Sequence, residues 1–82
     1  MTVDEVFVIT RATVAETFGV SVDEITRETV AEDVDGWDSL SHTILMLRLG
    51  RVLDTKIPEE VAADAATVGD LSDKLANLIS NQ

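Results

Sequence analysis

The chain has 82 residues, the length of one domain, and 45% of them are hydrophobic, so a packed core is expected rather than disorder. Its net charge is −10, from 16 acidic and 6 basic residues, which argues against nucleic acid or an anionic membrane as a partner. The lack of cysteine excludes disulfides, thiolate metal sites and cysteine catalysis. With no secretion signal and no apolar run of the ~18 residues that span a bilayer, a cytoplasmic protein is expected.

The first helix is expected over residues 3–18. Thr2-x-x-Glu5 has the spacing of a capping box, in which the two side chains bind free backbone N–H groups at a helix start. A helical spacing of three to four residues then relates Val3, Val6, Phe7, Thr10, Val14 and Phe18. Gly19 follows as a stop signal.

Residues 19–38 are expected to form a long loop, which in a small domain is usually functional or tightly packed. Ser21-x-x-Glu24 favours one short turn through Ile25, and the loop's later apolar anchors are Val30, Val34 and Trp37. Its last acidic residues are Glu32, Asp33, Asp35 and Asp38. Their spacing matches no calcium-loop pattern, so a solvated acidic loop is preferred to a metal site.

Three further helices are expected, over residues 39–53, 58–64 and 68–79. Pro58 suits the first position of the short helix, with Glu59 and Glu60 near its positive N-terminal end. Thr67-x-x-Asp70 resembles another cap before a regular apolar stripe. No strand pattern occurs, so the predicted fold class is all-α: a four-helix bundle with a long first loop and a short third helix.

The helix over 39–53 has two apolar faces, since residues advance about 100° each around the axis. The expected core face carries Leu45, Met46, Leu49, Val52 and Leu53. Leu40, Ile44 and Leu47 lie on the opposite face, with Arg51 beside them. Either this second face is an exposed docking ridge, or the long loop covers it through Trp37 or Val34. The periodicity alone favours neither interpretation.

Ser39 stands at or beside the start of this helix, where a serine commonly caps free backbone N–H groups. The same positive helix end tolerates a phosphate, so Ser39 is also a candidate for carrying a phosphodiester-linked group. Nothing nearby would activate it as a nucleophile, and a hydrolase using Ser39 and His42 ranks far behind. For His42, a half-buried ring hydrogen-bonded to the loop is preferred to a metal ligand, and no metal is expected.

Three segments together make the chain resemble the acyl carrier proteins, or phosphopantetheine-binding carrier domains: FGVSVDEIT, DGWDSL and LDTKIPEEVAADAATVGDL, at 18–26, 35–40 and 53–71. The resemblance covers almost the whole length. It implies that Ser39 receives 4′-phosphopantetheine from coenzyme A, with Asp38 and Leu40 as flanking recognition residues. The arm's thiol would then hold an acyl or aminoacyl cargo as a thioester, and the carrier itself would perform no catalysis.

The resemblance also implies partners: a phosphopantetheinyl transferase, a ligase that loads the cargo, and a downstream transferase or synthase. Fatty-acid carriers bear acids along the exposed side of the second helix, where this chain has Ser41, Ile44, Gly50 and Arg51. We therefore interpret it as a specialised, free-standing and monomeric member. Its expected partner contact is through Leu40, Ile44, Leu47 and Arg51. The alternative is an unmodified helical interaction module that uses the Leu40, Ile44 and Leu47 ridge.

Overall fold

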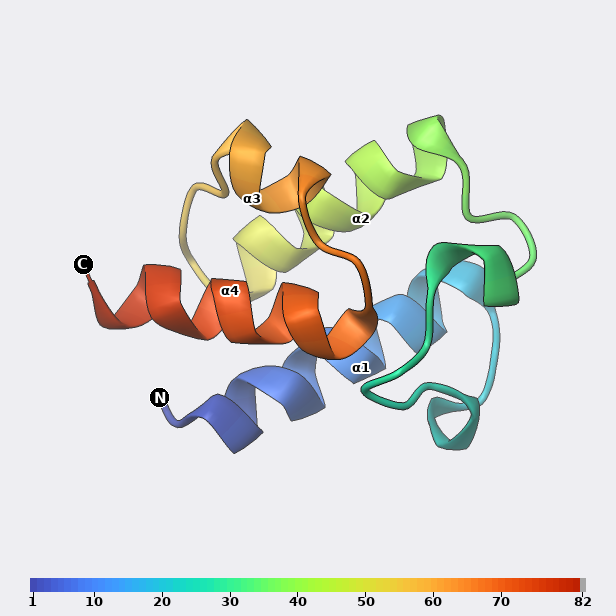
Figure 1. Ribbon diagram of the computed structural model, residues 1–82, viewed down its shortest axis with the longest axis horizontal. Coiled ribbons are helices and arrows are strands. Elements are labelled where there is room, and N and C mark those ends of the chain that lie inside the picture. The colour runs from blue at the N-terminus through green and yellow to red at the C-terminus, as the bar shows by residue number, and fades with distance from the viewer. Residues whose placement is uncertain (82) are drawn as a thin grey trace.

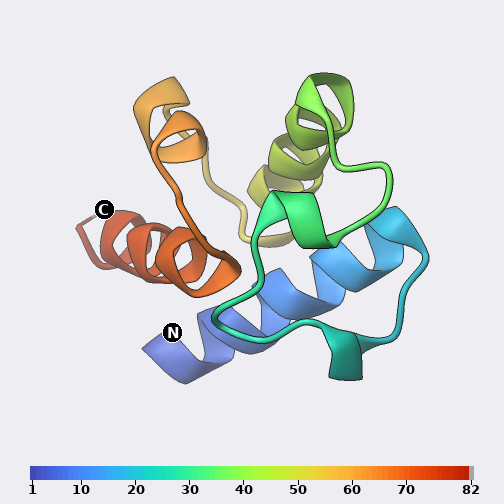
Figure 2. The ribbon, with the colours of Figure 1, turned by 45° about the vertical axis from the view of Figure 1, so that its right-hand side comes forward.

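The computed structural model describes residues 1–81. It contains four α-helices, α1 (Val3–Phe18), α2 (Ser39–Val52), α3 (Glu59–Ala63) and α4 (Val68–Ser80), and no strand within those residues. The predicted all-α, four-helix class is therefore confirmed. Helices α1 and α4 pack side by side in opposite directions, so both chain ends lie at one end of the bundle, and α2 crosses above α1 (Figure 1, Figure 2).

The helix starts follow local hydrogen bonding. Thr2 Oγ1 accepts the Glu5 N–H at 3.1 Å, and Glu5 Oε1 accepts the Thr2 N–H at 2.8 Å, which is the expected capping box. Pro58, expected as the first residue of the third helix, is instead its N-cap, with φ −62° and ψ 149°. That expectation was wrong because the proline ring fixes φ, which suits both positions, and leaves ψ free.

The loop of residues 19–38 packs tightly into the bundle. It forms two short 3₁₀ turns, η1 (Val22–Glu24) and η2 (Ala31–Asp33), of which only the first was expected. Ile25 and Val34 are buried in the core. The loop also crosses the start of α4, where the carbonyls of Arg27 and Thr29 accept the N–H groups of Gly69 and Val68 at 2.9 and 2.8 Å. These bonds satisfy donors that a helix N-terminus otherwise leaves free.

Helix α2 contributes Leu45, Leu49 and Leu53 to the core. Val52, expected there too, is 57% exposed, so that prediction was wrong. The buried arc is centred on Leu49, and at about 100° per residue Val52 lies roughly 60° from that centre, at the edge of the stripe. Met46 lies at the other edge and is half-buried. The whole core comprises Val6, Val14, Ala15, Ile25, Val34, Leu45, Leu49, Leu53, Val68, Leu71, Leu75 and Ala76.

Within residues 1–81, no helix has the length and apolar character needed to cross a membrane.

Candidate prosthetic-group site at the start of α2

Asp38 and Ser41 cap the N-terminus of α2. The Ser41 N–H donates to Asp38 Oδ1 at 2.9 Å, and the Asp38 N–H donates to Ser41 Oγ at 2.8 Å. The one hydrogen of the Ser41 hydroxyl is shared between two acceptors, the carbonyl of Gly36 at 2.7 Å and Asp38 Oδ1 at 3.0 Å. Gly36 has φ +87°, a left-handed conformation that favours glycine. The turn before the helix is thereby fixed by its own sequence, Gly36 to Ser41.

The cap also controls the charge of Asp38. The hydrogen bond from the Ser41 backbone N–H, and then that from the Ser41 hydroxyl, lowers the pKa of Asp38 below its usual value, because both favour the ionised carboxylate. Asp38 is therefore an anion that is already held by the helix start. This contribution of Ser41 was missed in the sequence, although the Asp38-x-x-Ser41 spacing is a recognisable variant of the capping box.

Ser39 is the first helical residue and is exposed to solvent. Its backbone carbonyl accepts the Thr43 hydroxyl at 3.1 Å, but Ser39 Oγ makes no hydrogen bond within residues 1–81. The interpretation of Ser39 as the capping residue is therefore wrong, since Asp38 holds that position. A free, exposed hydroxyl at a helix start fits a phosphodiester, whose charge is favoured by the positive end of the helix.

The second apolar face of α2 is uncovered. Leu40, Ile44 and Leu47 are 72%, 42% and 65% exposed, and Arg51 beside them is also exposed. The loop does not cover them, because Val34 is buried in the core and Trp37 stacks on Phe18, with ring centroids 5.0 Å apart. From the sequence, a covered ridge and an exposed ridge were equally favoured. In the structure the ridge is exposed.

Gly50, one of the four positions compared with the acids of fatty-acid carriers, has no room for a side chain. A Cβ atom added there would lie 2.9 Å from the Thr55 backbone oxygen. An acidic side chain is therefore sterically disfavoured at Gly50. Of the other three positions, Ile44 and Arg51 are exposed and Ser41 is half-buried.

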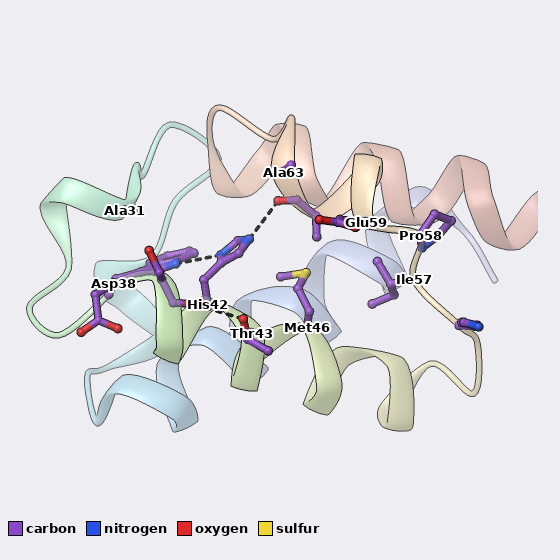
Figure 3. Close-up of a pocket in the computed structure, with 13 residues that line it drawn as sticks. Ala31, Asp38, His42, Thr43, Met46, Ile57, Pro58, Glu59 and Ala63 are labelled. Carbon is purple, nitrogen blue, oxygen red and sulfur yellow. Dashed lines mark hydrogen bonds between the residues drawn. The ribbon is translucent and has the colours of Figure 1, made fainter.

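A groove of about 950 Å³ runs from Asp38 and Ser39 along α2 towards α3. Figure 3 shows Met46, Glu59 and Ile57 along it, with Pro58 towards the end remote from Asp38. Its central lining is apolar. The groove begins beside the exposed serine, so a group tethered to Ser39 could fold into it. The sequence did not reveal this groove, because it depends on how far α3 stands from α2.

His42 lines the groove, with both ring nitrogens hydrogen-bonded. Trp37 Nε1 donates to His42 Nδ1 at 3.0 Å, and His42 Nε2 lies 2.8 Å from the carbonyl oxygen of Ala62. The expected half-buried, hydrogen-bonded histidine is therefore confirmed. These bonds leave no ring nitrogen to accept a proton from Ser39. In the described part of the chain, no group of three or more potential ligands is placed to hold a metal ion.

These features describe a small helical bundle with an exposed serine at the first position of α2, beside an apolar groove. Residues 10–75 match the family described as the phosphopantetheine attachment site. The chain is 38% identical over 71 residues to the acyl carrier protein of Exiguobacterium sp. (strain ATCC BAA-1283 / AT1b), covering 87% of this chain and 90% of that protein. The chain belongs to the phosphopantetheine-binding carrier protein family. Its members are carriers rather than enzymes, and the prosthetic group is covalent 4′-phosphopantetheine.

Proposed function

We propose that Ser39 carries the 4′-phosphopantetheine arm and that residues 1–82 act as a single carrier domain. When bound, the arm supplies a thiol that holds an acyl or aminoacyl cargo as a thioester. One observation carries this assignment: Ser39 Oγ is exposed and unbonded because Asp38 and Ser41 supply the cap. Asp38 and Leu40 flank it and are the residues we expect a phosphopantetheinyl transferase to recognise.

The exposed ridge of Leu40, Ile44 and Leu47 is the proposed docking surface for the ligase that loads the cargo and the transferase or synthase that receives it. The ridge begins next to Ser39, so a docked enzyme would lie within reach of the arm, and tethering would raise the local concentration of cargo. Arg51 makes no ion pair within residues 1–81, whereas Arg48 lies 3.8 Å from Glu16. A partner with an apolar patch bordered by acids complements this surface.

The chain offers an unusually clean test because it contains no cysteine. Incubation with a promiscuous phosphopantetheinyl transferase, Mg²⁺ and coenzyme A should add one phosphopantetheine to the intact mass. It should also create one titratable thiol per chain where there was none. Ser39→Ala should gain neither, whereas the matched variant Ser41→Ala should gain both. A folded wild-type protein that acquires no thiol contradicts the proposal.

A separate experiment addresses the second candidate, an unmodified interaction module, which the exposed ridge also favours. A module of that kind would bind its partner equally well whether or not Ser39 is present. The comparison is made in cells in which the variant replaces the wild-type protein. If cells with Ser39→Ala grow like the wild type while cells with Leu47→Glu grow like a deletion of the gene, the module is the better description.

A further inference from the structure

His42 is a bridge between α2 and α3. An indole nitrogen can only donate, so His42 Nδ1 accepts from Trp37, and Nε2 must carry the hydrogen that is donated to Ala62. This arrangement requires the neutral ring in a single tautomer. Figure 3 shows the ring reaching from α2 across to α3, with both hydrogen bonds drawn. Helix α3 itself packs mainly against α4, so His42 provides a specific polar link back to α2.

Two stacked aromatic rings, Phe18 and Trp37, support the His42 ring. Trp37 lies between Phe18, at a centroid distance of 5.0 Å, and His42, at 6.1 Å, and both pairs are close to parallel, with interplanar angles of 20° and 23°. Phe18 is the last residue of α1. The three rings therefore connect α1, the long loop and α2, and the hydrogen bond to Ala62 extends the connection to α3. We call these three rings the aromatic wall. While the two stacking contacts and the two hydrogen bonds persist, their side chains have few alternative rotamers.

Two hollows lie against this wall. The outer one is the groove of about 950 Å³ that begins at Ser39. The inner one, about 250 Å³, lies towards α4, and its lining includes both the core residues Val68 and Leu71 and the exposed residues Glu32 and Ala66. The residues that line both hollows are Ala31, Trp37 and His42. These three side chains are therefore the partition between the groove and a space that reaches the core.

The geometry points to His42 as the residue that sets how deeply cargo can enter the carrier. In this assignment, cargo on the arm occupies the outer groove and stops at the His42 ring, while the inner hollow stays closed. The carrier then shelters compact acyl or aminoacyl groups and leaves the ends of longer chains exposed. The inference rests on the proposed function, since it requires the arm on Ser39. It makes His42 a specificity-determining residue that touches cargo without reacting with it.

The test loads acyl-phosphopantetheine groups of increasing chain length from the corresponding acyl-coenzyme A and measures thioester cleavage by hydroxylamine. Burial protects a chain, so in the wild type protection should stop rising once the outer groove is filled. In His42→Ala the two hollows merge, and protection should continue to rise with length. Since each buried methylene favours the sheltered state by about fourfold, two further methylenes predict cleavage about fifteenfold slower for long chains.

Two matched variants separate a partition from a merely structural role. His42→Gln can keep both hydrogen bonds and should retain the wild-type length limit, because its amide fills the same gap. Thr43 lines the outer groove but not the inner hollow, so Thr43→Ala should also leave the length limit unchanged. Identical length dependence in the wild type and His42→Ala overturns the inference. A uniform loss of protection at every length in His42→Ala does so too.

Failure of the proposed function is visible separately, as a missing mass gain before any cargo is measured, and it removes the inference with it. A spectroscopic measurement tests the bridge without the arm. Nitrogen-15 spectra of the unmodified protein should show His42 with its hydrogen on Nε2. A hydrogen on Nδ1 would contradict the hydrogen bond from Trp37 and overturn the partition.

Discussion

The backbone N–H of Ser41 bonds to the Asp38 carboxylate at 2.9 Å while the Asp38 N–H bonds back to the Ser41 hydroxyl at 2.8 Å. Ser39 lies between these two residues in the sequence, but its side chain takes part in neither hydrogen bond. The start of α2 therefore keeps its cap whether Ser39 is free or modified. A carrier that must exist with and without its arm gains a stable helix start in both states.

Removing each serine in turn should separate the cap from the attachment site. Ser41→Ala removes the hydroxyl that binds Asp38 and Gly36, and should lower the free energy of unfolding by about 1 kcal/mol. Ser39→Ala removes an exposed, unbonded hydroxyl and should change it by less than about 0.5 kcal/mol. Urea denaturation of the unmodified proteins measures both. A larger loss in Ser39→Ala than in Ser41→Ala would mean that Ser39 is the capping residue after all.

The cap also predicts a pH dependence. Folding lowers the pKa of Asp38, chiefly through the Ser41 backbone N–H, so the ionised carboxylate stabilises the folded state. This contribution is complete above the unfolded pKa of about 3.9 and is lost as the pH falls through the lower folded pKa. The urea midpoint of the wild type should therefore fall towards that of Asp38→Asn on acidification. A constant gap between the two proteins across this range would exclude the assigned role.

The ridge predicts which surface changes affect partners. The double variant Ile44→Glu, Arg51→Glu places two carboxylates on an exposed face that has none, and should raise the KM of the loading ligase by about tenfold or more. Its unfolding free energy should fall by no more than about 1–2 kcal/mol, because Arg51 is exposed and Ile44, at 42% exposed, loses only part of its apolar packing. Val8→Glu is the matched control, since Val8 is 62% exposed on α1. Equal effects of both variants on KM would place the interface elsewhere.

Because the long loop packs against the start of α4, replacing Gly69 by alanine is expected to lower the free energy of unfolding rather than raise it. Alanine in place of glycine inside a helix normally stabilises by about 0.5–1 kcal/mol. A Cβ atom on Gly69, however, would lie 2.8 Å from the Arg27 carbonyl oxygen, so Gly69→Ala should destabilise by about 1–3 kcal/mol. Asn77→Ala, at an exposed position of the same helix, should show no such loss. Stabilisation by Gly69→Ala would show that the loop can move away at no cost.

The sequence predicted those parts of the fold that depend on neighbouring residues. Thr2 and Glu5 set the start of α1, and Gly19, with φ +67°, ends it. Both signals act within a few residues, which a single sequence reveals. The open face of α2 was recognised as a possibility for the same reason, because three apolar residues at helical spacing need no tertiary information to be placed on one side.

The remaining features depend on contacts between distant segments. The turn η2 has no side-chain cap at Val30 that would announce it, and Val52 is exposed because the core is centred on Leu49. The second partner of His42 is a backbone carbonyl 20 residues away, which no pattern of side chains encodes. The groove, and the partition inside it, follow from such contacts, and so they became visible only with the structure.

The central claim is that one oxygen, Ser39 Oγ, holds the arm. Cleavage after Arg27 and Arg48 of the transferase-treated protein releases a peptide containing both Ser39 and Ser41, and fragmentation by tandem mass spectrometry locates the added group between them. We expect every modified peptide to carry phosphopantetheine on Ser39 and none on Ser41. An arm found on Ser41, or a folded protein whose peptide remains unmodified, would contradict it.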